Sequence, residues 1–232
     1  VAALQTRVDR KYVLTRAEAA EVLAELDPAT RVLEIDGSSE LAYESVYFDT
    51  PDLLSYRMAA HARRRRFKLR TRSYVDTATS FLEMKTRGAR SATVKDRIEY
   101  DIEHRDVLTV EGREYAESAL DGLGIRHADE LDLVPTLVTR YNRMTLFLPG
   151  SVSRATVDTR LAWEDAAGSI SQRPNLTIIV TKSGLRTSEV DHLLWSHGHR
   201  PARISKFGTG LAALRPDLPS NKWARVLRRH FS

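Results

Sequence analysis

The residues of this chain best suited to chemistry are the cations between Arg63 and Tyr74, where the sequence reads RRRRFKLRTRSY. Side chains alternate between the two faces of a β-strand, so a strand here places on one face Arg64, Arg66, Lys68, Arg70, Arg72 and Tyr74. The other face carries Phe67, Leu69 and Thr71, which suits packing against helices. Because a buried unpaired charge costs several kcal/mol, the cationic face must meet water or an anionic ligand. A solvated strand face and a basic nucleic-acid patch are the alternative interpretations.

Composition limits the classes of protein that fit. The 232 residues are 42% hydrophobic and contain no Pro/Gly/Ser-rich linker or internal repeat, so we expect one domain spanning residues 1–232. The absence of cysteine excludes disulfides and thiolate metal sites and suits a reducing cytoplasm, where we expect the protein. No apolar run approaches the roughly 20 residues of a spanning helix. Membrane contact is therefore expected only through segments outside this chain or through another subunit.

Segments that alternate apolar and polar residues dominate the chain, as is typical of β-strands. The expected strands are Thr6–Leu14, Arg31–Ile35, Ala42–Asp49, Arg64–Tyr74, Ser80–Arg87, Ala92–Glu103, Leu137–Phe147, Arg154–Trp163 and Leu176–Lys182. The expected helices are Arg16–Leu26 after a Thr15 cap, Pro51–Met58, Arg113–Leu123, Ser188–His197 and Asn221–His230. Long strands with few, peripheral helices predict a closed barrel or a strongly curved sheet, since closure removes exposed edges.

Charged residues also share faces on the other long strands. The sets that lie together are Glu83 with Lys85, Lys95 with Glu99, Arg154 with Asp158, and Arg143 with Tyr141. For any one strand, a half-exposed antiparallel sheet is the ordinary explanation. The coincidence over five strands instead favours a lumen lined by polar side chains.

Eight short motifs occur in order over nearly the whole chain: RKYVL (10–14), SVYFDTPDL (45–53), FKLRTRSY (67–74), FLEMKTR (81–87), TVKDR (93–97), RYNRMTLFLPG (140–150), RATVDT (154–159) and ISKFGTGLA (204–212). In these motifs the chain resembles the VTC domain, the polyphosphate-polymerase branch of the CYTH-like triphosphate tunnel metalloenzyme superfamily. The resemblance implies an α+β fold built on a closed eight-stranded antiparallel β-barrel with peripheral helices. It also implies a tunnel that binds triphosphate or polyphosphate.

The same resemblance implies which cations contact phosphate. The central set is Lys11, Arg70, Arg72, Lys85, Arg143, Arg154 and Lys206, and further phosphate-binding candidates are Lys95, Lys182, Arg64, Arg66 and Lys68. Arginine suits this role because its fork binds two phosphate oxygens at once, whereas lysine acts as a point charge. For each residue, an ion pair with a nearby carboxylate or simple exposure to solvent is the alternative.

The resemblance further implies a divalent cofactor, Mn²⁺ or Mg²⁺, which requires oxygen ligands. Glu83, Glu99 and Asp158 lie on the expected inward faces and are the candidate ligands, although they could equally balance the cations. The family usually presents a metal-binding Glu two residues before the Lys of its TKS motif. Here that position is Val180, which cannot bind a metal, and its presence puts catalysis in question.

The leading functional prediction is a polyphosphate polymerase domain that transfers the γ-phosphate of ATP to a growing chain. The expected partners are ATP, triphosphate and inorganic polyphosphate. A tripolyphosphatase or nucleoside triphosphatase, a non-catalytic polyphosphate-binding module and an RNA-binding barrel are the alternatives. Aromatic residues make up only 7% of the chain, which argues against base stacking, so no nucleic-acid partner is expected.

Overall fold

A computed structural model describes residues 8–87, 93–184 and 186–231 of this α+β protein. The chain divides into two compact units of non-contiguous segments. The first unit comprises Val1–Ala42, Tyr141–Ala162 and Gln172–Ile204, and the second comprises Tyr43–Arg140, Trp163–Ser171 and Ser205–Ser232. The expectation of one domain over residues 1–232 stays a prediction.

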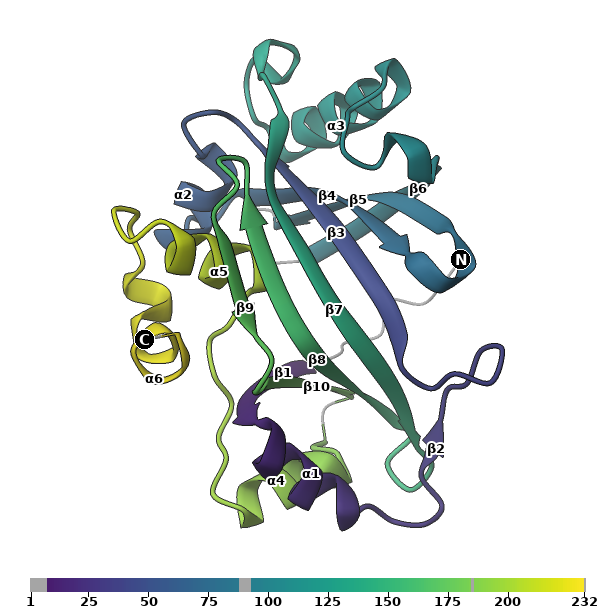
Figure 1. The fold of residues 1–232 in the computed structure, drawn as a ribbon. Coiled ribbons are helices and arrows are strands. Elements are labelled where there is room, and N and C mark those ends of the chain that lie inside the picture. The colour runs from purple at the N-terminus through teal and green to yellow at the C-terminus, as the bar shows by residue number, and fades with distance from the viewer. Residues whose placement is uncertain (1–7, 88–92, 185, 232) are drawn as a thin grey trace. The chain divides into compact units, whose positions relative to one another are not determined.

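Ten strands make up the described part of an antiparallel sheet (Figure 1). They are β1 (Val8–Thr15), β2 (Arg31–Val32), β3 (Leu41–Asp49), β4 (Arg66–Tyr74), β5 (Thr79–Arg87), β6 (Thr93–Tyr100), β7 (Val134–Leu148), β8 (Ser153–Asp165), β9 (Ile170–Arg173) and β10 (Leu176–Ser183). The hydrogen-bonded order is β1-β10-β8-β7-β3-β4-β5-β6, with β2 on β7 and β9 on β8.

The closed eight-stranded barrel is not confirmed, because the described residues contain no pairing between β1 and β6, the two ends of this strand order. The sequence of β6 gives a physical reason. Its residues from Thr93 to Arg97 are exposed on both faces, and Val94 keeps 57% of its surface accessible. A strand without a buried face lacks the hydrophobic contacts that fix the register of a further pairing.

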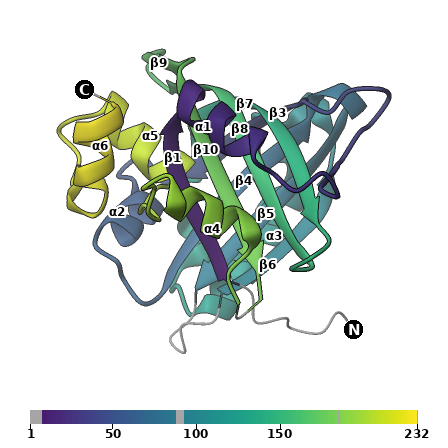
Figure 2. The ribbon, with the colours of Figure 1, turned by 90° about the horizontal axis from the view of Figure 1, so that it is seen from below.

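In the first unit, two helices pack on one face of the strands. Helix α1 (Arg16–Ala24) and helix α4 (Glu189–Ser196) lie side by side in Figures 1 and 2. Their apolar residues share a buried core with strand residues such as Tyr12 and Ile179. Helix α1 begins with the expected Thr15 cap, which forms a reciprocal capping box with Glu18.

In the second unit, helix α3 (Val110–Leu123) covers the apolar face of β3 to β6. The alternation predicted for the cationic segment is confirmed, since Phe67 and Leu69 are buried in this core. Their neighbours Lys68, Arg70 and Arg72 are only partly buried and point to the opposite face.

Two elements of the structure were not expected from the sequence. Strand β9 is short, and helix α5 (Lys206–Leu214) contains two glycines, which disfavour helix formation. A Cβ atom at Gly208 would collide with Trp223, and one at Gly210 would collide with Trp163. These glycines therefore allow close packing of α5 on two indole rings.

Several expected elements are shorter or shifted. The strand expected at Arg31–Ile35 ends at Val32, and the strand expected at Ala92–Glu103 ends at Tyr100 because Ile102–His104 forms a 3₁₀ turn. Ala92 and the beginning of the strand expected at Thr6–Leu14 lie outside the described residues. The helix expected at Pro51–Met58 is α2 (Leu54–Ala60), and that expected at Asn221–His230 is a 3₁₀ turn followed by α6 (Ala224–His230). Within the described segments, no helix has the length and apolar run needed to cross a bilayer.

Candidate functional site

In the second unit, the face of β4 and β5 that points away from α3 carries a guanidinium–carboxylate cluster. Arg70 donates to one oxygen of Glu83 from Nε at 2.9 Å and from Nη2 at 2.6 Å. Its Nη1 donates to the Tyr47 hydroxyl at 3.0 Å. Because the register places Arg70 between Tyr47 on β3 and Glu83 on β5, these contacts follow directly from strand pairing. They fix the plane of the guanidinium.

Arg72 lies two residues further along the same face. Its Nη1 is 3.5 Å from Oε1 of Glu83, so one carboxylate serves two arginines. Its Nε is buried and has no hydrogen-bond partner among the described residues, and the same is true of Oγ of Ser45, the residue opposite it on β3. Ser45 is 1% exposed. A buried donor without a partner is costly, and an anion's oxygen could satisfy both groups.

Three lysines form a lateral row on this face, because the register aligns Lys68 with Lys85 and Lys85 with Lys95. Lys68 Nζ donates to Ser205 Oγ at 2.8 Å, and Ser205 caps the N-terminus of α5. Lys206 is therefore the first residue of a helix and not part of a strand. Adjacent cations of this kind repel one another, and a polyanion would offset that repulsion.

The cationic ladder is shorter than the sequence predicted. Arg64 is exposed and precedes β4, so its assignment to the ladder is wrong: the strand begins only at Arg66. Arg66 donates to the Arg63 carbonyl at 2.6 Å and lies opposite Arg87. Burial, with a smaller contribution from Arg87, lowers the pKa of Arg66.

The first unit holds a second group of expected site residues. Arg143 on β7 forms a two-point ion pair with Asp158 on β8, with Nε to Oδ1 at 2.6 Å and Nη2 to Oδ2 at 2.9 Å. The Asp158 side chain is fully buried, and the Arg143 guanidinium also lies 5.1 Å from the Tyr141 ring. Lys11 Nζ donates to the Ile204 carbonyl at 3.0 Å.

Val180, which stands where the family usually has a Glu, lies on strand β10. Val180 lies opposite Lys11 on β1 and opposite Thr156 on β8, and Lys182 lies opposite Arg154. Thr156 is 2% exposed, and its hydroxyl has no hydrogen-bond partner within the described parts of the chain. An apolar side chain therefore stands in a polar row of the sheet.

The three candidate carboxylates, Glu83, Glu99 and Asp158, do not by themselves form a metal-binding site. Glu83 and Asp158 are both engaged by arginine, and Glu99 is exposed on β6, opposite Phe81. Among the described residues, no three His, Cys, Asp or Glu side chains come close enough to hold an ion. The ion pairs of Glu83 and Asp158 are those expected of carboxylates that balance arginine charges. Metal binding by Glu83, Glu99 and Asp158 stays a prediction. Mg²⁺ commonly takes only one or two carboxylates together with substrate phosphates.

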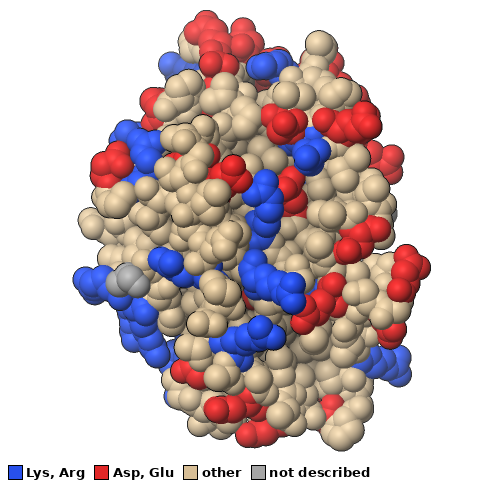
Figure 3. Space-filling model, in the orientation of Figure 1, with Lys and Arg blue, Asp and Glu red and all other residues tan. Residues whose placement is uncertain are grey.

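Tyr47, Ser45 and Phe207 lie in or beside the guanidinium–carboxylate cluster and were not predicted from the sequence as candidate site residues. Tyr47 orients Arg70 and stacks on Phe207 of α5, with ring centroids 4.9 Å apart. The signal that could have found Tyr47 is its position in SVYFDTPDL, where alternation places it on the same face as Ser45. On the face viewed in Figure 3, positive and negative residues are interspersed.

Solved structures of other proteins resemble this one in fold. A Hippeastrum protein named as an adenylyl cyclase with a dominant triphosphatase activity superposes with a TM-score of 0.55 at 17% identity, covering 93% of this chain and 99% of that one. A Vibrio parahaemolyticus protein named as an adenylate cyclase gives a TM-score of 0.48 at 13% identity, covering 89% and 98%. The likeness to the Hippeastrum protein shows that the two chains share a fold.

The sequence itself defines the family. Residues 6–215 match the VTC domain, so the chain belongs to the VTC domain family. The resemblance carried by the eight motifs is thereby confirmed. No match was found among curated proteins.

Proposed function

We propose that this protein is a polyphosphate polymerase domain that uses ATP as its phosphoryl donor. The observation that carries the proposal is the cluster on β4 and β5, where Arg70 and Arg72 share one carboxylate beside the buried, unpartnered Ser45 hydroxyl. This cluster occurs in a chain of the VTC family. Arginines held in place beside the unpartnered Arg72 Nε and Ser45 hydroxyl suit a chain of phosphates.

The proposed reaction asks for positioning and charge neutralisation. A terminal oxygen of the polyphosphate chain attacks the γ-phosphorus of ATP, the bond from that phosphorus to the β,γ-bridging oxygen breaks, and ADP leaves. The chain is then longer by one phosphate. No protein nucleophile is required, because catalysis of phosphoryl transfer rests mainly on alignment and on stabilising the charge of the phosphoryl oxygens.

Each group of cations has a role in this proposal. In the second unit, Arg70 and Arg72 contact phosphate oxygens, while the row of Lys68, Lys85 and Lys95 neutralises further phosphates. In the first unit, we assign phosphate contacts to the cations Lys11, Arg143, Arg154 and Lys182. Lys206 and Arg66 are weaker assignments. The closed barrel implied by the family also stays a proposal.

Two other functions have specific support. The Hippeastrum neighbour favours a triphosphatase, in which water replaces the chain end as acceptor. Val180 favours a non-catalytic binding module, because the valine leaves its polar row without the carboxylate usual in the family. We expect Mn²⁺ or Mg²⁺ to arrive bound to substrate phosphates, since Glu83 and Asp158 are paired with arginine.

One assay separates the three functions. The purified chain is incubated with ATP and Mn²⁺ or Mg²⁺, and the products are resolved by size. Phosphate chains longer than three units support the polymerase, orthophosphate alone supports the hydrolase, and unchanged ATP together with measurable tripolyphosphate binding supports the binding module.

A further inference from the structure

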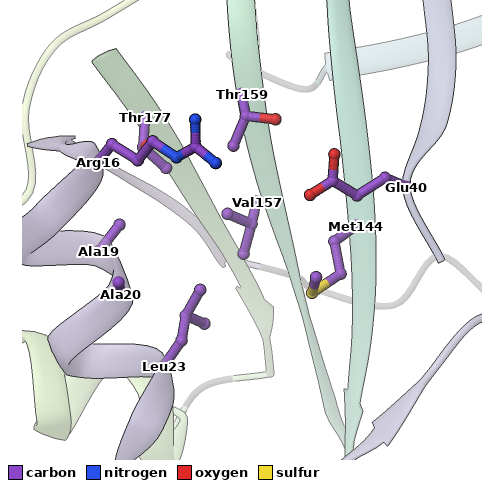
Figure 4. Close-up of a pocket in the computed structure, with 9 residues that line it drawn as sticks. All are labelled: Arg16, Ala19, Ala20, Leu23, Glu40, Met144, Val157, Thr159 and Thr177. Atoms are coloured by element: carbon purple, nitrogen blue, oxygen red, sulfur yellow. The ribbon is translucent and has the colours of Figure 1, made fainter. Parts of the chain in front are cut away.

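The first unit contains a small cavity, half open to solvent, between α1 and the face of the sheet that α1 covers (Figure 4). Its volume is about 140 Å³, and its lining residues are Arg16, Ala19, Ala20, Leu23, Glu40, Met144, Val157, Thr159 and Thr177. Pockets for drug-sized ligands span roughly 300–1,000 Å³, so the occupant of this cavity is smaller. None of the lining residues belongs to the proposed phosphate site.

Two opposite charges face the cavity. In Figure 4 the Arg16 guanidinium and the Glu40 carboxylate extend toward its centre from opposite sides. Both residues are exposed, and among the described residues neither side chain makes a hydrogen bond or an ion pair, with the other or with a third residue. A ligand with separate positive and negative groups could contact both.

Thr177 is the buried residue at the end of the cavity near Arg16. Thr177 is 1% exposed, and its Oγ1 has no hydrogen-bond partner in the described structure. Thr15 pairs with Leu176, and the Arg16 amide donates to the Asn175 carbonyl, so Thr177 lies beside the start of α1. The Thr177 side chain therefore closes this end of the cavity.

The remaining wall of the cavity is aliphatic. Ala19 and Ala20 leave space beside α1, and the apolar side chains that close this space are Leu23, Met144 and Val157. Such a surface favours a branched hydrocarbon group over a polar one, at about 25 cal/mol for each Å² removed from water.

We propose that this cavity binds an α-amino acid with an aliphatic side chain, in its zwitterionic form. Arg16 binds the carboxylate, Glu40 binds the ammonium group, and the aliphatic wall contacts the side chain. The Thr159 hydroxyl lies between the two charged residues in Figure 4 and provides a further polar contact. This site is independent of the proposed phosphate chemistry.

Titration calorimetry of the whole chain with L-leucine tests the proposal, with melting temperature as a second readout. We expect saturable binding and a raised melting temperature. 4-Methylpentanoate lacks the ammonium group and isoamylamine lacks the carboxylate, so each should bind about tenfold more weakly or worse. Absence of leucine binding, or equal affinity for either single-charge analogue, overturns the proposal.

Three variants locate the site. Arg16→Gln and Glu40→Gln should each lower leucine affinity about tenfold, because each removes one charge-assisted contact. Ala20→Phe, at an exposed position of α1, should fill the cavity and abolish binding while the melting temperature without ligand is kept. Glu21→Gln, on the exposed side of α1, is the matched control and should change nothing. Leucine binding that survives all three substitutions places the ligand elsewhere and overturns the proposal.

Discussion

The Arg70 guanidinium donates two hydrogen bonds to a single oxygen of Glu83, from Nε at 2.9 Å and from Nη2 at 2.6 Å. The other oxygen of that carboxylate lies 3.5 Å from Nη1 of Arg72. Glu83 therefore holds both arginines side by side with a net positive charge. A phosphate oxygen that approaches them meets donors whose geometry is already fixed, so less conformational entropy is lost on binding.

Replacing both Arg70 and Arg72 with alanine should weaken tripolyphosphate binding by roughly 3 kcal/mol or more, since each charge-assisted hydrogen bond contributes about 1.5–3 kcal/mol. Titration calorimetry measures the affinity, and circular dichroism checks that the fold is kept. The control is Arg113→Ala with Arg126→Ala, which removes the same charge from exposed positions of the second unit. If both double variants lose affinity equally, the effect is one of net charge and not of this site.

Tyr47→Phe should reduce tripolyphosphate affinity several-fold. The substitution removes the hydroxyl that accepts from Arg70 and keeps the ring that stacks on Phe207. Stability should fall by about 1 kcal/mol, the usual net contribution of one hydrogen bond. Chemical denaturation and calorimetry measure the two effects separately. Unchanged affinity in the folded variant would show that Tyr47 does not orient a phosphate-binding Arg70.

Val180→Glu should raise metal-dependent turnover, since it supplies the carboxylate that the family usually has at this position. The new side chain would stand opposite Lys11 and Thr156, so stability without metal should change little or fall slightly. Rates of both proteins are compared across a Mn²⁺ series at saturating ATP. Equal rates and equal metal dependence would mean that residue 180 is not a ligand position.

We expect Asp49 to lower the free energy of unfolding as pH rises, which is the opposite of the usual effect of a carboxylate in a folded protein. Its carboxylate accepts backbone N–H bonds from Thr50, Ser55 and Tyr56, yet burial outweighs these bonds and raises its pKa to about 6, from 3.8. Between these two values the folded state binds more protons than the unfolded state. The free energy of unfolding should therefore fall as pH rises through this window and level off above about pH 6.

The difference between the wild-type protein and Asp49→Asn isolates this contribution from those of other groups. The Asn variant should be less stable overall, because its amide cannot accept the bonds to both carboxylate oxygens, but it should lack this part of the pH dependence. Carboxyl-carbon NMR gives the pKa directly. A value near 3.8 for Asp49 would contradict the prediction.

Much of the strand pattern follows from local sequence. The alternation of Phe67 and Leu69 with Lys68 and Arg70 is a property of residues two apart, so it survives in the structure. The capping box of Thr15 with Glu18 is equally local. Such features depend on a few neighbouring residues and need no tertiary information.

The features that were missed depend on residues distant in sequence. Helix α5 contains glycines because Trp163 and Trp223 pack closely on it, and this contact cannot be inferred from the local pattern. The pairing of Arg143 with Asp158 likewise depends on the register of β7 with β8. Sequence patterns identified the charged residues, whereas the strand register determines which carboxylate each arginine binds.

Transfer of a labelled phosphate tests the central claim most directly. The chain is incubated with unlabelled tripolyphosphate, a divalent metal and ATP that carries radioactive phosphorus at its γ-position, and the products are separated by length. The proposed polymerase moves the label into phosphate chains one unit longer than the primer, and the Arg70→Ala, Arg72→Ala variant does so much more slowly. Label found only in orthophosphate, or retained entirely in ATP, would contradict polyphosphate synthesis by this protein.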